Sequence, residues 1–293
     1  MLTKPKLDQA EGLRRMVSPR PVQVIAVTSG KGGVGKTNLS INLSIAMAQA
    51  GKEVLVLDAD FGLANVDVLL GLHASHTLSD VLDGVRTLEE IILTGPSGVK
   101  IVPGSSGMQR MAGLSSLEQA GLIRAFSELG NRIDVLLIDT AAGISDSVIN
   151  FTKAAQEILV VVCDEPASIT DAYATIKVLN RDHGVHRFRI VANMVQNAQE
   201  GRDLYCKLLN VTDKFLDVQL DFMGAVPFDD FLKRSIQRQK AVVEVYPRSK
   251  AALAFKTLAQ KADKWPVPQN AGGHVEFFIE RLINSNQEME ASL

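Results

Sequence analysis

The chain has 293 residues, of which 46% are hydrophobic and 22% charged, with a formal net charge of -2 and an isoelectric point near 6.2. A chain of this length and apolar content can bury a sizeable core, as one large α/β domain or two modest ones. The slightly acidic balance argues against a protein dominated by nucleic-acid binding. Its two cysteines, Cys163 and Cys206, form no C-x-x-C pair, which fits a reducing compartment and gives no sign of an iron-sulphur or zinc site.

The apolar runs of the chain are short. Residues 158–163 have the length of a strand, whereas a helix needs about 20 apolar residues to cross a bilayer. Residues 1–6 open no apolar signal-peptide core. We therefore expect a cytoplasmic protein.

The first ordered elements are predicted around a glycine-rich loop. Residues 1–20 are polar and basic, and the apolar run 22–27 then predicts a buried strand. Residues 30–37, with the sequence GKGGVGKT, fit the phosphate-loop pattern G-x-x-x-x-G-K-[ST] and carry an additional lysine at Lys31. Apolar residues at helical spacing follow as far as Gly51. Strand, loop and helix are the context that this motif requires.

Each residue type in the loop has a chemical reason. Glycines let successive backbone N–H groups and the new helix N-terminus point at one phosphate chain. Lys36 would bring positive charge to the β- and γ-phosphates, and Thr37 a hydroxyl to Mg²⁺. A glycine-rich turn that binds nothing is the alternative, but the complete match in context favours a phosphate site. The predicted nucleotide-binding residues here are Gly32, Gly33, Val34, Gly35, Lys36, Thr37 and Asn38.

Further along, strand-like and helical patterns alternate. Apolar runs without polar alternation are typical of parallel strands that are covered on both faces. The alternation predicts an α/β fold with a single doubly wound, mostly parallel sheet, helices on both faces, and ligands at the carboxyl ends of the strands. The predicted strands are 54–58, 99–103, 135–139, 158–163 and 188–193, and the predicted helices include 116–129, 146–155, 168–179 and 248–262.

Two of these strands end in an aspartate, Asp58 and Asp139, and a further carboxylate, Asp60, follows the first. Hydrophobic strands that end in a carboxylate near a phosphate loop can hold Mg²⁺ through its waters. Each aspartate alone could be a cap or a loop residue. The phosphate loop favours the functional interpretation, with Thr37, Asp58 and Asp139 as the predicted metal site.

The additional Lys31, the stretch 58–60 and the stretch 139–143 resemble the deviant Walker A ATPases of the MinD/ParA group, over roughly residues 20–262. The resemblance implies a P-loop NTPase fold, ATP and Mg²⁺ as ligands, slow hydrolysis to ADP and phosphate, and an ATP-dependent homodimer. It implies that Lys31 reaches the partner's phosphates, which would make Lys31, Lys36 and Asp60 the catalytic residues. Asp60 would serve the attacking water.

The same resemblance assigns the nucleotide base to Asn193 and to the backbone near Pro227. A turn residue at the end of a strand is the alternative for Asn193.

The N-terminus narrows the resemblance. Residues 8–14 are similar to the short activating motif of flagellar-number regulators of the FlhG/FleN type. This similarity implies a segment, including Asp8, Gln9 and Arg14, that stimulates a polar GTPase of the signal-recognition-particle class, with Gln9 near the partner's nucleotide. It also implies restraint of a flagellar master transcription activator. A frayed, solvated helix start is the alternative.

The C-terminus carries an amphipathic pattern. We predict a partner-activating segment at 1–20, an ATPase domain at 21–264, a linker at 265–273 and an amphipathic helix and tail at 274–293. In the family such a helix docks reversibly on the membrane, but acidic residues here outnumber Arg281, so insertion would rest on the apolar face. Packing on the protein's own surface is an equal alternative, and the two states can alternate with ATP. The apolar face consists of Val275, Phe278, Ile279, Leu282 and Ile283.

Other functions stay open at this point. A MinD-type division-site or a ParA-type DNA-partition ATPase would keep the same enzyme, and a nucleotide-binding scaffold would not hydrolyse at all. An iron-sulphur carrier is disfavoured by the missing C-x-x-C. The basic residues of 233–240 are expected on a solvated or partner-binding helix face, without direct nucleic-acid binding. The histidine pairs at 73/76 and 183/186 are expected to be solvated loop residues.

Overall fold

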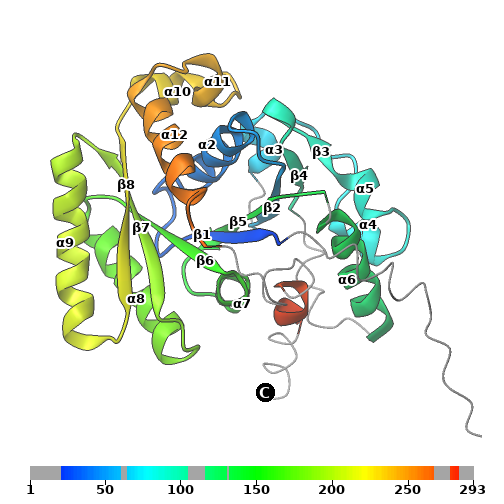
Figure 1. Cartoon of the computed structure of the whole chain (residues 1–293), viewed down its shortest axis with the longest axis horizontal. Coiled ribbons are helices and arrows are strands. Elements are labelled where there is room, and N and C mark those ends of the chain that lie inside the picture. The colour runs from blue at the N-terminus through cyan, green and yellow to red at the C-terminus, as the bar shows by residue number, and fades with distance from the viewer. Residues whose placement is uncertain (1–20, 61–64, 105–115, 131, 267–277, 284–293) are drawn as a thin grey trace, which may run out of the picture.

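The computed structural model describes residues 21–60, 65–104, 116–130, 132–266 and 278–283. Within these residues the strands form one sheet of eight in the order β3-β4-β2-β5-β1-β6-β7-β8. Every pair of neighbouring strands is parallel except β3 with β4, which is antiparallel. The doubly wound, mostly parallel sheet predicted from the sequence is confirmed (Figure 1). The strands are β1 (Gln23–Ser29), β2 (Val54–Ala59), β3 (Leu93–Thr94), β4 (Lys100–Val102), β5 (Val135–Ala142), β6 (Glu157–Val162), β7 (Arg187–Val195) and β8 (Gln219–Pro227).

Helices cover both faces of the sheet, which explains why β1 is buried along its whole length. One core cluster packs α2, α11 and α12 against one face. Two further clusters pack α6 and α7, and then α8 and α9, against the other face. The helices are α2 (Lys36–Gln49), α3 (Val66–Leu69), α4 (Leu78–Leu82), α5 (Leu88–Ile91), α6 (Ser116–Gly130), α7 (Asp146–Ala154), α8 (Pro166–Arg181), α9 (Ala198–Phe215), α10 (Asp230–Gln237), α11 (Val242–Val245) and α12 (Lys250–Ala262), with a 3₁₀ turn η1 at Pro96–Gly98.

Some elements were not predicted. The two-residue β3 is too short to leave a periodic pattern, and β8 forms no continuous apolar run, with only Leu220, Met223 and Val226 buried. Helix α9 was also missed, although Asn197 accepts hydrogen bonds from the main-chain N–H groups of Gln199 and Glu200, as an N-cap residue should. The predicted elements differ from those observed mainly at their ends.

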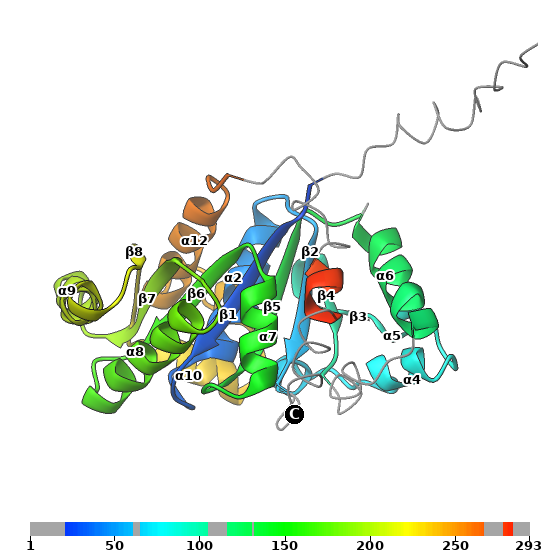
Figure 2. The same cartoon turned by 90° about the horizontal axis from the view of Figure 1, so that it is seen from below.

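The described part of the C-terminal helix, 278–283, packs onto the core. Phe278, Ile279, Leu282 and Ile283 are each at most 2% exposed, and the Phe278 ring lies 6.5 Å from that of Phe151 on α7. Figure 2 shows this segment in red between α7 and α6. The alternative of packing on the protein's own surface is therefore the one that this structure contains.

Several predictions fall outside the described residues. They concern the segment 1–20 with Asp8, Gln9 and Arg14, most of the linker 265–273, and Val275. Across the part of the chain that the structure describes, no helix is both long enough and apolar enough to traverse a bilayer.

Candidate nucleotide site

The glycine-rich loop connects β1 to α2 and has the backbone shape of an anion cradle. Gly33 and Gly35 have φ values of 81° and 88°, in the left-handed region that favours glycine. Gly30 lies against α8, where an added Cβ would come within 2.2 Å of the main-chain carbon of Asp171. Helix α2 begins at Lys36, so its first N–H groups face the loop.

A cleft of ≈ 470 Å³ lies over this loop, at the carboxyl ends of the parallel strands. Residues at or just after the ends of β1, β2, β5 and β7 form its walls together with the loop and α3. It is lined by Ser29, Lys31, Gly32, Gly33, Gly35, Lys36, Thr37, Asn38, Asp60, Asn65, Val68, Leu69, Ala142 and Met194.

Asp139 lies beneath the loop with one oxygen bonded and the other without a partner. Its Oδ1 accepts hydrogen bonds from Ser40 Oγ at 2.8 Å and Lys36 Nζ at 3.4 Å. Its Oδ2 is buried and has no hydrogen-bond partner among the described residues. Burial raises the pKa of Asp139, against the opposing effects of Lys36, Ser40 and Thr37. A buried oxygen of this kind suits a cation or its bound water.

Asp58 organises the turn that follows β2. Its Oδ1 accepts from the N–H of Asp60, and its Oδ2 from those of Asn65 and Val66, at 3.1 to 3.2 Å. Burial, and then the neighbouring Asp139, raise the pKa of Asp58 to about 7. Because both oxygens are engaged with backbone groups, Asp58 anchors the turn that brings Asp60 to the cleft.

These residues fit a magnesium ion that is held together with nucleotide phosphates. No cluster of three or more His, Cys, Asp or Glu side chains suited to a metal occurs within the described ranges. Mg²⁺ needs fewer protein ligands than that, because it keeps several waters and takes oxygens from the phosphates. The Thr37 hydroxyl and the unpartnered Asp139 oxygen are the groups that would hold it, while the role of Asp58 as a metal neighbour stays a prediction.

Lys31 lies at the rim of the cleft in an ion pair. Its Nζ is 2.7 Å from Glu165 Oε2, and both side chains are exposed. The hydrogen bond with Glu165 raises the pKa of Lys31, which stays a cation. Glu165 is the N-cap residue of α8 and was not singled out from the sequence.

Asn193 and Pro227 come together at the neighbouring ends of β7 and β8. The Asn193 side chain is buried and donates from Nδ2 to the main-chain oxygen of Val34 at 2.7 Å. Next to it Met194 has a φ of 59° at a register shift, which turns its exposed side chain toward the cleft. Asn193, Met194 and Pro227 line an adjoining, mostly apolar cavity of ≈ 410 Å³ together with Phe228. The assignment of the base to this place stays a prediction.

Three contributors were missed from the sequence: Ser40, Glu165 and Met194. Ser40 could have been found, because it lies four residues after Lys36 and therefore on the same face of α2. Glu165 and Met194 come from distant segments and carry no local signal. The buried Cys163 contacts the loop as well, through Sγ at 3.6 Å from the Val34 oxygen, and burial raises its pKa to about 11.

Comparison with known proteins identifies the family. The ParA family model, described as "NUBPL iron-transfer P-loop NTPase", matches residues 21–263. The chain belongs to the ParA/MinD family of P-loop NTPases. This confirms the resemblance that the additional lysine and the aspartate stretches indicated.

The chain is similar to two curated relatives. The chain is 59% identical over 271 residues to "Antiactivator FleN" of Pseudomonas aeruginosa, covering 92% of this chain and 97% of that protein. It is 34% identical to "Flagellum site-determining protein YlxH" of Helicobacter pylori, over 76% of each chain.

Among solved structures, the cell division ATPase MinD of Pyrococcus furiosus aligns with a TM-score of 0.66 and 25% identity, over 83% of this chain and 98% of that one. MinD of Pyrococcus horikoshii, solved in complex with Mg-ADP, aligns with a TM-score of 0.65 and 26% identity, over 83% and 96%. The ligand of that relative is the kind of molecule for which the loop and the Asp139 oxygen are suited.

Proposed function

We propose that this protein is an ATP-dependent dimerising switch that regulates flagellar number. The observation that carries the proposal is the 59% identity to a protein named "Antiactivator FleN", which extends over nearly the whole of both chains. On this proposal the protein restrains a flagellar master transcription activator from the cytoplasm or the inner face of the membrane.

The chemistry proposed for the cleft is slow, magnesium-dependent hydrolysis of ATP to ADP and phosphate. Lys36 and the loop N–H groups neutralise and orient the phosphates, and Mg²⁺ supplies further positive charge when it is bound. Thr37 and Asp139 would hold the metal and its waters, and Asp60 would position the attacking water. Asp58 accepts a hydrogen bond from the N–H of Asp60 and so fixes that residue at the cleft.

On this proposal, dimerisation completes the catalytic site. In the single chain Lys31 is held by Glu165 at the rim of the cleft. We infer that in the ATP-bound dimer Lys31 leaves Glu165 and contacts the partner's phosphates, so that assembly and charge neutralisation are coupled. This requires only that an exposed ion pair be exchanged, which is energetically inexpensive.

The proposed partners follow from the two ends of the chain. Residues 8–14 would stimulate a polar GTPase of the signal-recognition-particle class. The helix that contains 278–283 would leave its place on α7 when the dimer forms and contact the membrane through Phe278, Ile279, Leu282 and Ile283. Because the residues around that face are acidic, its insertion into lipid depends on apolar contacts.

Mass measurement on the purified protein with ATP or ADP tests the switch. A dimer with ATP and a monomer with ADP are expected, and Lys31→Ala should remain a monomer in both. A wild-type monomer under both conditions would contradict the dimerisation mechanism. Asp60→Ala should bind ATP and dimerise but hydrolyse it far more slowly; equal turnover in the variant would remove Asp60 from the reaction.

The fold match to MinD structures favours a division-site ATPase as the second candidate. Deleting residues 1–20 separates the two functions. On the flagellar proposal the deletion abolishes stimulation of the partner GTPase and leaves ATP hydrolysis unchanged. An unaltered GTPase rate would favour the second candidate.

A further inference from the structure

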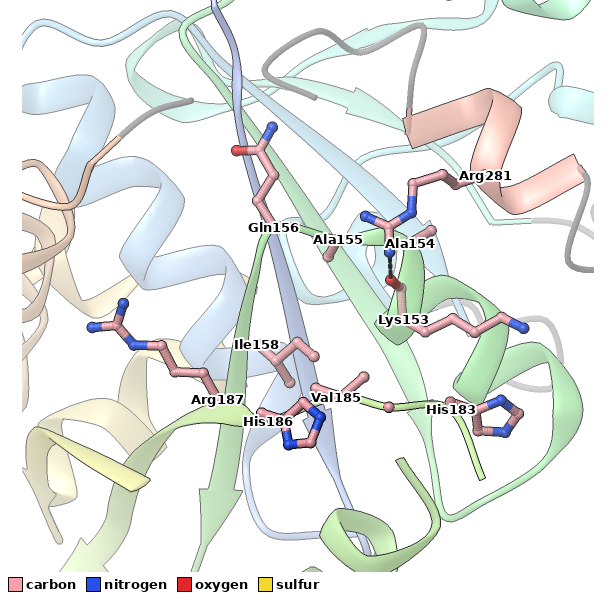
Figure 3. A pocket seen from close by; sticks show the side chains of 11 residues that line it. Lys153, Ala154, Ala155, Gln156, Ile158, His183, Val185, His186, Arg187 and Arg281 are labelled. Atoms are coloured by element: carbon pink, nitrogen blue, oxygen red, sulfur yellow. Dashed lines mark hydrogen bonds between the residues drawn. The ribbon is translucent and has the colours of Figure 1, made fainter. Parts of the chain in front are cut away.

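A second cavity lies at the edge of the sheet opposite to the nucleotide cleft, at the amino ends of β6 and β7. Its volume is ≈ 500 Å³, a size usual for small-molecule sites. Four separate segments form it: the end of α7, the start of β6, the turn between α8 and β7, and the C-terminal segment 278–283 (Figure 3).

The lining of this cavity is basic over an apolar floor. Ala154, Ala155, Ile158 and Val185 supply the floor, and among the described residues no aspartate or glutamate belongs to the lining. Cationic side chains around a partly enclosed space, here Lys153, Arg187 and Arg281, create a positive potential within it. The basic residues are Lys153, His183, His186, Arg187 and Arg281.

Arg187 and His186 have carboxylates close by. Arg187 pairs with Asp221 at 2.8 Å, and His186 Nδ1 lies 2.9 Å from the main-chain oxygen of Asp217 and 3.9 Å from its carboxylate. The positive charge at this side of the cavity is therefore partly balanced.

The opposite side of the cavity carries Lys153 and His183. Lys153 makes no hydrogen bond or ion pair through its ammonium group in the described part of the chain. It extends to the same side as His183. Burial and Lys153 lower the pKa of His183, against the weaker opposite effects of Asp182 and Asp146. An anion placed between Lys153 and His183 would relieve this repulsion.

Arg281 connects the cavity to the C-terminal segment. Its Nη2 donates to the main-chain oxygen of Lys153 at 2.8 Å, near the end of α7. Figure 3 shows the guanidinium reaching from the segment to this oxygen. Arginine at a helix C-terminus stabilises the exposed carbonyls. Here the same contact places the positively charged guanidinium at the wall of the cavity.

We propose that this cavity binds a phosphorylated small molecule or headgroup, with Lys153, His183 and Arg281 contacting the phosphate and the apolar floor contacting the organic part. A phosphate bound there bridges 278–283 to α7 and to the turn before β7. Occupancy therefore holds the C-terminal segment on the core. The cavity is separate from the nucleotide cleft, so ligand binding to the cavity can be tested independently of the function proposed for the cleft.

The test titrates inorganic phosphate, at constant ionic strength, into the full chain saturated with Mg-ADP, so that the cleft is occupied. Imidazole NMR signals report the location, because the chain has five histidines. We expect the signals of His183 and His186 to shift, with those of His73 and His76 unchanged, and the pKa of His183 to rise. Lys153→Gln should weaken phosphate binding about tenfold, the effect of one charge-assisted hydrogen bond.

The matched control is Lys214→Gln, which removes the same charge from an exposed position on α9. It should leave phosphate binding unchanged, and Mg-ADP affinity should be equal in all three proteins, which shows that Lys153→Gln is folded. Phosphate that moves neither His183 nor His186 would overturn the proposal. Equal weakening in both variants would do the same, since it would reveal only a general charge effect.

Sedimentation with vesicles of phosphatidylglycerol and phosphatidylcholine distinguishes the two sources of phosphate. If the natural ligand is a lipid headgroup, Lys153→Gln reduces vesicle binding and free phosphate competes with the vesicles. If the ligand is soluble, free phosphate lowers vesicle binding of the wild type by holding the segment on the core, and Lys153→Gln is insensitive to phosphate. Both results support the proposal only if phosphate also shifts the NMR signals of His183 and His186.

Discussion

The nucleotide cleft and the basic cavity lie at opposite edges of one sheet and are built from different materials. The cleft is formed around a contiguous loop whose glycines at 33 and 35 adopt positive φ, so its anion contacts come largely from main-chain N–H groups. The cavity is formed by side chains from four segments, one of which is the short C-terminal segment 278–283. A main-chain cradle is fixed by the fold, whereas a side-chain site can be gained, lost or coupled to a movable element. The two sites should therefore respond differently to substitution.

Among the substitutions, Lys36→Ala is expected to show the largest difference between its effects on the cleft and on the cavity. Lys36 is buried in the cleft and far in the fold from the cavity. Removing its charge should weaken ATP binding about 100-fold or more, the effect of losing a buried charged hydrogen bond. Phosphate binding to the cavity, followed through His183, should be unchanged. Calorimetry with ATP and the histidine titration check the two sites, and parallel loss at both would show that they are one coupled site.

Phe278→Ala should act on the cavity and spare the cleft. Truncating a buried phenylalanine costs about 3–5 kcal/mol in a core that cannot rearrange, but the segment 278–283 can undock, and that limits the loss. We expect weaker phosphate binding and unchanged ATP affinity. Leu253→Ala, at a position 53% exposed on α12, is the control for loss of apolar surface. Phosphate binding as tight as in the wild type would contradict a contribution of the segment 278–283 to the cavity.

The dependence of protein stability on pH should arise from titratable groups of the cleft. Asp58 has a pKa of about 7 in the fold against 3.8 in the unfolded chain, so the folded protein holds this proton to higher pH. The free energy of unfolding of the nucleotide-free protein should therefore fall as the pH rises from about 4 to about 7, by about 2 kcal/mol between pH 5 and pH 7. Asp139, whose pKa is also raised, adds to the same trend.

Asp58→Asn is the control for this pH response, because the amide does not titrate. Urea unfolding at several pH values should show a flatter profile in the variant. A profile as steep as that of the wild type would assign the response to another group. Lys214→Gln, at an exposed position on α9, should leave the profile as it is.

The sequence predicted the cleft better than the cavity for a physical reason. A phosphate loop is local, because its glycines, lysine and threonine fall within residues 30–37. The aspartates at the strand ends can be recognised because each follows an apolar run. The parallel sheet was predictable in the same way, from runs such as 158–163. The cavity joins Lys153, the turn at 183–187 and Arg281, whose proximity depends on the packing of the C-terminal segment. His183 and His186, expected as solvated loop residues, line a cavity only because of that packing.

The smallest effect is expected at the rim of the cleft, from Glu165→Gln. The ion pair of Lys31 with Glu165 is exposed, so its loss changes stability little. If this pair holds Lys31 back from a partner's phosphates, the variant should dimerise with ATP at a few-fold lower protein concentration, in line with the weakness of surface ion pairs. Sedimentation velocity over a range of concentrations measures this. Glu200→Gln, which alters a carboxylate on α9 away from the cleft, is the matched control. Dimerisation that is weaker in Glu165→Gln would mean that Glu165 supports the dimer instead of competing with it for Lys31.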